Sequence, residues 1–341
     1  MRFLIYISER YGIPIGEPIQ KEIYARGDEV RWFCESPSLK ESLENDMVLL
    51  ESVEAVKAYN PDAVLVTANV VPDFFPGLKV QLFHGFSVGK RAAEKGHFNI
   101  RGFFDLYCTQ GPTTTEPFLR LQQRYRYFDV VETGWPKVDP LFPLEIYDND
   151  RPVIMISSTF TTRLSLAKNR EAVAEIARIS KLGKWDFIAV LHPKMEQEVV
   201  EVFRQMQHAH FTFYDTTDLI PLYKRADVML SDTTSAITEF ALQKKMVVTL
   251  NNNQPQPYMI NIPRADKIEE AIEEALDRPA EKVKALESFI AQTHPYDDGK
   301  SSARVIDAVK IRIEEGKIRR KPLNLIRRFK IRKKLGYWRW W

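Results

Sequence analysis

Short apolar runs separated by segments with helical spacing recur along most of this chain. Runs such as Phe3–Ile7, Ala63–Thr67, Val153–Ser157 and Val228–Leu230 have the length of buried strands. Amphipathic stretches such as Asn169–Leu182 lie between them. This alternation is typical of parallel sheets, because two parallel neighbours have to be joined by a long, usually helical, crossover. The sequence therefore predicts an α/β fold built on doubly wound parallel sheets.

The same pattern occurs twice, which predicts two domains. A chain of 341 residues exceeds what one ordinary core needs. We expect one Rossmann-like domain at 1–147, a second at 148–316 whose last helix could pack back on the first domain, and a basic tail at 317–341. The two domains are expected to face a cleft. The acidic Asp148-Asn149-Asp150 sequence precedes Pro152 and is interpreted as a linker, although it matches a D-x-D metal pattern.

Positive charge is concentrated at the C-terminal end. The net charge is +3, yet eleven Lys or Arg and no acid lie between Lys317 and Trp341, so the remaining body carries about −8. Apolar and aromatic residues interleave with these cations, a composition that suits the headgroup region of an anionic membrane. RNA binding and a disordered solubilising tail are the alternatives. We predict membrane binding through Lys317–Trp341 and no nucleic-acid partner.

Cysteine usage and hydropathy indicate a cytoplasmic protein that binds the inner face of the cell membrane peripherally. The chain has two cysteines, Cys34 and Cys108, in apolar surroundings, which favours buried, reduced thiols over a disulfide. The apolar start, Met1–Ile7, is shorter than a signal sequence requires, and no apolar run approaches the length of a membrane span.

The segment around His84 is the first candidate for chemistry. A predicted strand, Val80–Phe83, ends at His84, and the carboxyl edge of a parallel sheet is where ligands collect. Gly85 allows close approach of a substrate to the backbone. A histidine there could accept the proton of an attacking hydroxyl. The alternative is a structural or solvated histidine.

The second half repeats this arrangement and adds an anion site. His192-Pro193 closes the strand Phe187–Leu191, and His192 with Lys194 could stabilise charge on a transferring phosphate. A hydroxyl-rich segment follows the strand Val228–Leu230 and leads into a helix, whose first N–H groups favour an anion such as a diphosphate. Its residues are Ser231, Asp232, Thr233, Thr234 and Ser235. Glu239, about one turn later, could accept from sugar hydroxyls. An ordinary N-cap is the alternative.

No cofactor or metal is predicted. The six histidines show no metal-ligand spacing, and His97, His208 and His210 are interpreted as surface residues. Neither the G-x-x-x-x-G-K-[ST] nor the G-x-G-x-x-G pattern occurs, so ATPase, kinase and dinucleotide-binding functions lose their main support.

Five motifs occur in an order that resembles the CDP-glycerol glycerophosphotransferases, the teichoic-acid primase and polymerase group. They are His84-Gly85 with Lys90, Thr133-Gly-Trp-Pro-Lys-Val-Asp139, His192-Pro193, Ser231-Asp-Thr-Thr-Ser-Ala-Ile-Thr-Glu-Phe240 and Asp298-Gly-Lys-Ser-Ser-Ala-Arg304. The resemblance covers residues 75–310. It implies a GT-B fold with an N-terminal acceptor domain and a C-terminal nucleotide-donor domain. The implied reaction moves glycerol or ribitol phosphate from a CDP-polyol to a hydroxyl of a cell-envelope glycan or lipid-linked acceptor, releasing CMP without a metal.

The resemblance also implies roles for individual residues. His84 matches the family's proposed base and His192 its second essential histidine motif. Substrate contacts are expected from Gly85, Ser87, Lys90, Lys194, Ser231, Asp232, Thr233, Thr234, Ser235 and Glu239. The sequence departs from the family at Phe86-Ser87, where Thr-Pro is usual, at Thr233 in place of Tyr, and at Glu239 in place of Asp.

Two other functions are compatible with the same sequence. An inverting GT-B glycosyltransferase would use an NDP-sugar donor and release a nucleoside diphosphate. A non-catalytic membrane-bound binding module would keep the fold without turnover. Because one fold serves many activities, the fold alone does not separate them.

Overall fold

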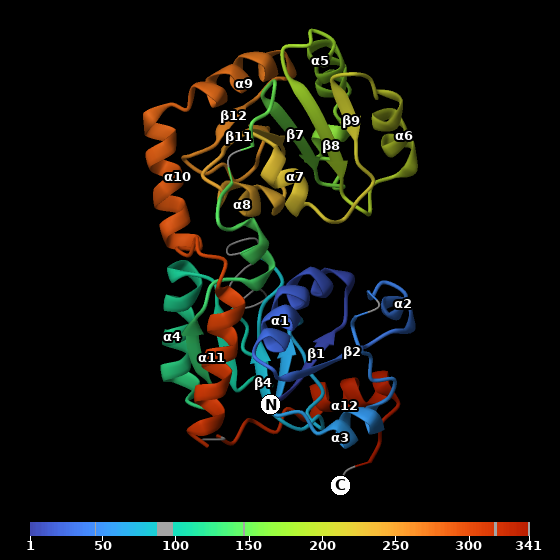
Figure 1. Cartoon of the computed structure of the whole chain (residues 1–341), viewed down its shortest axis with the longest axis vertical. Coiled ribbons are helices and arrows are strands. Elements are labelled where there is room, and N and C mark those ends of the chain that lie inside the picture. Colours follow the sequence, from blue (N-terminus) through green and yellow to red (C-terminus); the bar gives the residue numbers. More distant parts are fainter. Residues whose placement is uncertain (45, 87–97, 146, 317–318, 340–341) are drawn as a thin grey trace. The chain divides into compact units, whose positions relative to one another are not determined.

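The computed structural model describes residues 1–44, 46–86, 98–145, 147–316 and 319–339 (Figure 1). The chain divides into two compact units. Unit 1 comprises Met1–Pro140 and Thr293–Trp341, and unit 2 comprises Leu141–Gln292. The first boundary lies after residue 140, where 147 was expected. The last helix of the expected second domain, α11 (Ser301–Glu314), packs back against α1 (Ile13–Ala25) and β4 (Leu78–Gln81) of unit 1.

Unit 1 is built on a six-stranded sheet in the order β2-β1-β3-β4-β5-β6, with every neighbouring pair parallel. Its remaining strands are β1 (Arg2–Ile7), β2 (Glu29–Cys34), β3 (Ala63–Val66), β5 (Leu106–Thr109) and β6 (Asp129–Glu132). Its remaining helices are α2 (Pro37–Lys40), α3 (Val53–Tyr59), α4 (Pro112–Tyr125) and α12 (Leu325–Leu335). Except at Arg2, the inner strands are buried along their whole length, as expected of a parallel sheet covered on both faces.

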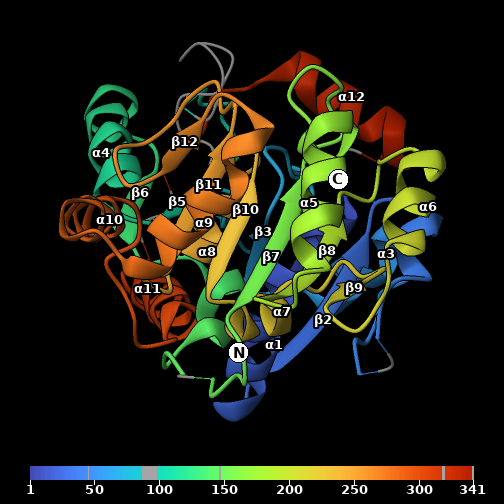
Figure 2. The same ribbon diagram turned by 90° about the horizontal axis from the view of Figure 1, so that it is seen from above.

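Unit 2 repeats the architecture with the order β12-β11-β10-β7-β8-β9, again all parallel. The strands are β7 (Val153–Ser158), β8 (Asp186–Leu191), β9 (Phe211–Phe213), β10 (Val228–Ser231), β11 (Met246–Leu250) and β12 (Ile260–Ile262). The helices are α5 (Arg170–Ser180), α6 (Gln197–Gln205), α7 (Ile220–Arg225), α8 (Ala236–Ala241), α9 (Ile268–Asp277) and α10 (Ala280–Thr293). Figure 2 shows α5 and α9 in contact over one face of this sheet. The two parallel sheets confirm the predicted α/β class.

The glycines and prolines between Glu9 and Glu17 indicate a loop from the sequence alone, but α1 already begins at Ile13. Pro14 lies in the first turn, where its missing N–H costs no hydrogen bond. Gly16, which reads as a loop residue in the sequence, allows α1 to approach the sheet. A Cβ at this position would lie 2.3 Å from the Trp32 ring.

The basic tail is part of the unit 1 core and not a free extension. Residues 67–77, between β3 and β4, contain no helix. The face of the sheet that α3 and α4 cover is completed by α12, whose Ile331 lies in the same buried cluster as Val56 of α3 and Phe118 of α4. Tyr337 belongs to this cluster, and its hydroxyl accepts from Lys57 Nζ. The alternative of a disordered tail is therefore wrong for the described residues 319–339.

Two smaller expectations concern thiols and membrane spans. Cys34 and Cys108 are free and buried, as the sequence predicts. Burial raises the pKa of the Cys34 thiol to about 11 and that of Cys108 to about 12. None of the helices in the described part of the chain has the length and apolar character needed to cross a bilayer.

Candidate functional site

His84 follows a sharp turn of the backbone just beyond β4. The strand ends at Gln81, two residues before the predicted end, and Phe83 has a φ of 60°. A bulky residue rarely adopts this conformation, and such strain collects at functional sites. Phe83 is held by burial against Phe118, with ring centroids 5.2 Å apart. The turn leaves His84 exposed at the carboxyl edge of the sheet, where the sequence places it.

The neighbours of His84 fix which ring nitrogen is basic. Nδ1 lies 3.4 Å from the carbonyl oxygen of Thr67, which follows β3. A carbonyl can only accept, so Nδ1 carries the proton in the neutral imidazole and Nε2 is the basic nitrogen. The Tyr11 ring lies against the imidazole, with centroids 5.1 Å apart. The geometry is suited to a general base acting through Nε2.

Buried polar groups surround the loop that carries His84. Gln110, which follows β5 and is fully buried, donates to the carbonyl of Gly85 across 3.2 Å. Gln110 Oε1 and Thr67 Oγ1 are buried without a hydrogen-bond partner among the described residues, which is unusual enough to point to a ligand or an ordered water. The other residues expected in this loop, Ser87 and Lys90, lie outside the described residues.

His192 of unit 2 follows β8, as predicted, and has the opposite proton arrangement. Its Nδ1 accepts the backbone N–H of Lys194 at 3.0 Å, so in the neutral ring the proton is on Nε2. Partial burial, helped by the Lys194 charge, lowers the pKa of His192 below its ordinary value. The Phe160 ring packs on it at 4.6 Å. His192 is thus a neutral Nε2–H donor at neutral pH.

Two residues of the predicted anion segment, Ser231 and Asp232, are buried, and their side chains form hydrogen bonds within unit 2. Ser231 Oγ donates to the carbonyl of Ser157. Asp232 accepts from Ser158 Oγ at 2.6 Å, and from the backbone N–H groups of Thr159 and Leu166 at 3.1 and 2.9 Å. Burial raises the pKa of Asp232, while these donors oppose the rise. Asp232 therefore joins the loops that follow β10 and β7.

The remaining residues of that segment differ in exposure. Ser235 is exposed, and Thr233 and Thr234 are half-buried. Thr233 Oγ1 accepts from the backbone N–H of Asn253 at 3.3 Å. Glu239 is buried on α8 and accepts from the Tyr223 hydroxyl at 3.4 Å. The open hydroxyls of 233–235 are the part of the segment that can meet a ligand, and the sugar-binding role of Glu239 stays a prediction.

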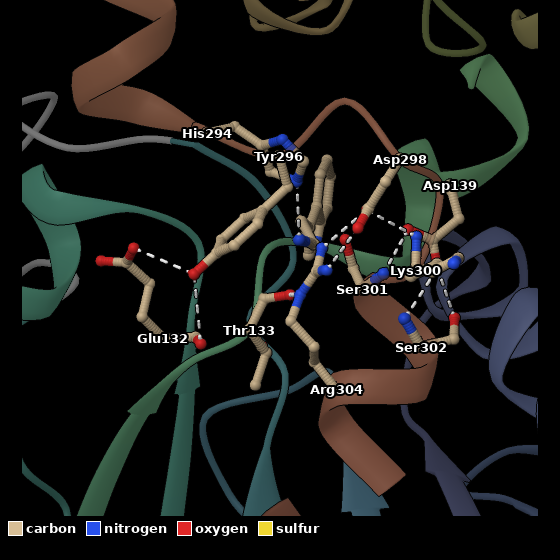
Figure 3. A network of polar contacts seen from close by, with 11 residues as sticks. Glu132, Thr133, Asp139, His294, Tyr296, Asp298, Lys300, Ser301, Ser302 and Arg304 are labelled. Atoms are coloured by element: carbon tan, nitrogen blue, oxygen red, sulfur yellow. Dashed lines mark hydrogen bonds and ion pairs between the residues drawn. The ribbon is translucent and has the colours of Figure 1, made fainter. Parts of the chain in front are cut away.

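Two of the five sequence motifs meet in one polar network inside unit 1 (Figure 3). Asp139 accepts from the backbone N–H groups of Ser301 and Ser302 at 2.9 and 2.7 Å, and so caps α11. The backbone N–H of Trp135 donates to Nε2 of buried His294 at 2.9 Å. Arg304 donates to the carbonyl of Thr133 at 2.9 Å. These motifs hold residues 293–304 against β6, which is a structural role.

This network also supports the His84 loop. Phe86, which departs from the family pattern, packs edge-on against Trp135 at 4.8 Å and against His294 at 6.0 Å. The glycine at position 134 is the signal in the sequence that could have revealed this network. In the structure Gly134 has a φ of 80°. A Cβ at Gly134 would lie 2.5 Å from Ser301 Oγ, so the close approach requires glycine.

No group of three or more His, Cys, Asp or Glu residues in the described ranges could hold a metal ion. The D-x-D sequence lies within unit 2 and not between the units, and Asn149 Nδ2 donates to the carbonyl of Arg225 and to Asp227.

Comparison with known proteins defines the fold class. Residues 151–310 match a family model described as UDP-N-acetylglucosamine 2-epimerase. The structure of the wall teichoic acid polymerase TagF is similar, with a TM-score of 0.62 and 14% identity over 92% of this chain and 89% of that chain. No curated protein matches the sequence.

Two further structures are similar to the same degree. The Staphylococcus aureus MnaA–UDP structure has a TM-score of 0.65 and 14% identity, over 92% of this chain and 97% of that chain. The Neisseria meningitidis UDP-GlcNAc 2-epimerase bound to UDP-GlcNAc has a TM-score of 0.62 and 13% identity, over 92% and 100%. At these identities the likeness establishes the fold, which is GT-B-like.

Proposed function

We propose that this chain transfers glycerol or ribitol phosphate from a CDP-polyol to a hydroxyl of a cell-envelope glycan or lipid-linked acceptor, releasing CMP. The observation that carries the proposal is the exposed His84 at the carboxyl end of β4, with Nδ1 facing the Thr67 carbonyl, which makes Nε2 the basic nitrogen. The order of the five motifs and the likeness to TagF, one structure of which was soaked with CDPG, support the choice of donor.

In the proposed reaction, the acceptor oxygen attacks the phosphorus that bears the polyol. A new O–P bond forms while the bond from that phosphorus to the bridging oxygen of the diphosphate breaks. The bridging oxygen and its electron pair leave with CMP, and His84 Nε2 takes the acceptor proton. No oxidant, reductant or further reactant is required.

Residues of unit 2 are proposed to stabilise the negative charge on the phosphates during the transfer. The neutral Nε2–H of His192 donates to a phosphate oxygen, and Lys194 adds an exposed positive charge beside it. Thr233, Thr234 and Ser235 supply hydroxyl donors to the donor's phosphates. Asp232 keeps their loop in place through its contacts with the loop after β7.

A second candidate function has its own support. The family model described as UDP-N-acetylglucosamine 2-epimerase matches residues 151–310, a range that includes His192 and the Ser231–Glu239 segment. This match favours a nucleotide-sugar donor, used either for epimerisation or for glycosyl transfer by an inverting mechanism. All three reactions start from a nucleotide-activated substrate, and they differ in the product.

The product identifies the reaction. The full chain is incubated separately with CDP-glycerol, CDP-ribitol and UDP-GlcNAc, together with a membrane extract as the source of acceptor. Nucleotides are separated by chromatography and the sugar is examined by NMR. We expect CMP from a CDP-polyol, with release reduced in His84→Gln and unchanged in the surface control His208→Gln. UDP release would instead support glycosyl transfer, and inversion at C2 of an intact UDP-sugar would support an epimerase.

A further inference from the structure

The inward face of α12 is fixed to unit 1 by burial and by ion pairs. Ile331 and Arg332 are buried, and the Arg332 guanidinium lies 3.3 Å from Asp73. Lys321 Nζ lies 2.7 Å from Asp105, just before β5. At the other end, Lys334 Nζ lies 2.9 Å from Glu35, just after β2. The tail therefore runs from the amino edge of the sheet to its carboxyl edge, the edge that carries His84.

The outward side of the tail is apolar. Seventeen large hydrophobic side chains are exposed among the described residues. Five of them lie in one stretch of sixteen residues inside the tail, and each of the five is at least 47% exposed. These five are Leu323, Leu325, Ile326, Phe329 and Trp338. Ile326 is 74% exposed, and the Phe329 and Trp338 rings lie together at 5.4 Å. We call these five residues the apolar patch. Exposed side chains clustered in this way indicate a binding surface.

Cations surround the apolar patch. Lys330 and Lys333 follow Ile326 by four and seven residues on α12, so they share its face, and Arg320 and Arg327 are also exposed. No ion pair joins Arg320, Lys330 or Lys333 to an acid that the structure describes, in contrast to the inward cations. An apolar patch with a cationic border fits a lipid bilayer, which has negatively charged headgroups at its surface and hydrocarbon beneath them.

We propose that the outward face of α12, with the apolar patch at its centre, docks on an anionic lipid bilayer. A single-stranded nucleic acid would use the cations and stack on Phe329 and Trp338, but it would gain little from the aliphatic Leu325 and Ile326. A second copy of the chain would bring Lys330 and Lys333 against cations of the same sign, because a two-fold interface is self-complementary. A lipid surface uses both the apolar side chains and the charges.

The docking surface and the candidate catalytic edge belong to the same compact unit. Lys334 contacts Glu35 at the carboxyl edge of the sheet, so binding of α12 would hold that edge near the lipid surface. Delivery of a lipid-linked acceptor to His84 rests on the proposed function. Lipid binding itself does not, because it is measured without any donor, and the two proposals can therefore fail separately.

The test is sedimentation of the full chain with phosphatidylcholine vesicles that contain or lack phosphatidylglycerol. One variant combines Lys330→Gln with Lys333→Gln, and a second combines Ile326→Gln with Phe329→Gln. The matched control combines Lys181→Gln with Leu182→Gln, an exposed cation and an exposed apolar residue of unit 2, the latter 55% exposed. Thermal unfolding of each variant shows whether the fold is intact, which is expected because all six side chains are on the surface.

We expect the wild-type chain and the control to bind anionic vesicles equally. The lysine variant should bind about 25-fold more weakly, or roughly fivefold for each cation. The apolar variant should lose about tenfold and should retain less binding at high salt, where only the apolar contribution persists. Brominated lipids should quench wild-type fluorescence more than that of Trp338→Phe. The proposal would be overturned if both variants bound anionic vesicles as tightly as the wild-type chain, or if the wild-type chain did not bind them. It would also be overturned if the chain bound RNA but not vesicles and the Ile326→Gln change left RNA binding unaltered.

Discussion

The backbone N–H of Lys194 donates to Nδ1 of His192 across 3.0 Å, while the charge of the same lysine opposes protonation of that ring. Lys194 therefore sets the tautomer of the imidazole and adds to burial, the larger cause of the lowered pKa of His192. His84 has the reverse arrangement, with Nδ1 facing the Thr67 carbonyl at 3.4 Å. The two histidines are thus prepared for different tasks, one as a donor at Nε2 and the other as a base at Nε2.

Removing the Lys194 charge should raise the pKa of His192. The substitution Lys194→Gln keeps the backbone N–H and eliminates the positive charge that disfavours the imidazolium, whereas burial, the larger cause of the lowered pKa, is retained. The measurement is an NMR titration of the His192 ring, with Lys181→Gln as a control at an exposed lysine. A pKa that stays constant or falls in Lys194→Gln would contradict this account.

Replacing His84 should reduce turnover without reducing donor binding. Loss of a general base typically costs about 10²–10⁴-fold in rate, so we expect His84→Gln to fall in that range. Donor-induced thermal stabilisation should match that of the wild-type chain. The pH–rate profile of the residual activity should lack the wild-type decline at acid pH, since a protonated imidazole cannot accept a proton. Equal loss of donor binding and turnover would indicate a binding role instead.

Neutralising Asp232 should destabilise unit 2. In Asp232→Asn the amide group would face a backbone N–H of Thr159 or Leu166, placing a donor against a donor in a buried position. Hydrogen bonds to buried charged groups are worth about 1.5–3 kcal/mol, so a loss of about 2–4 kcal/mol is expected. The midpoint of chemical denaturation measures this loss. Asp148→Asn, at an exposed acid that precedes β7, should change stability by less than about 0.5 kcal/mol.

Unit 1 should become less stable as the pH falls towards 4. Burial lowers the pKa of His294 from 6.5 to about 4. Between these values the unfolded chain binds a proton that the folded chain does not, so the stability present above pH 6.5 decreases on acidification. The full effect is about 3 kcal/mol. The measurement is the difference between the denaturation midpoints at about pH 7 and about pH 5. This difference should be smaller in His294→Gln than in the control His210→Gln. A larger difference in His294→Gln would show that His294 is not the cause of the pH dependence.

Strands and their direction were predictable because their signal is local. The strands predicted at Phe3–Ile7 and Phe187–Leu191 each differ by one residue from β1 and β8. These segments are continuous apolar runs that only a buried strand accommodates. The helix α4 was not predicted, because it begins at a proline, contains Pro117 and has few apolar residues. Its Phe118 is nonetheless fully buried.

The candidate site was predictable only in part. His84 and His192 were found because each closes an apolar run, a feature visible in the sequence. Gln110 was missed, although it follows β5 in the same way, because a lone glutamine after a strand carries no chemical signal. Asp232 was assigned to a ligand because hydroxyl and acidic residues before a helix suggest an anion site. Whether such a group points outward or inward depends on neighbours such as Ser158, which is 74 residues away.

The sequence by itself determined the type of sheet, the duplication of the architecture and the position of both histidines, because these follow from hydrophobic periodicity and strand length. Only the tertiary structure decided the helix around Gly16, the tautomers of the two histidines and the division of the tail into a buried and an exposed face. Each of these depends on a contact between distant residues, such as Trp32 against Gly16 or Asp73 beside Arg332. Local propensity cannot encode such contacts, since the partner's position is fixed by the fold as a whole.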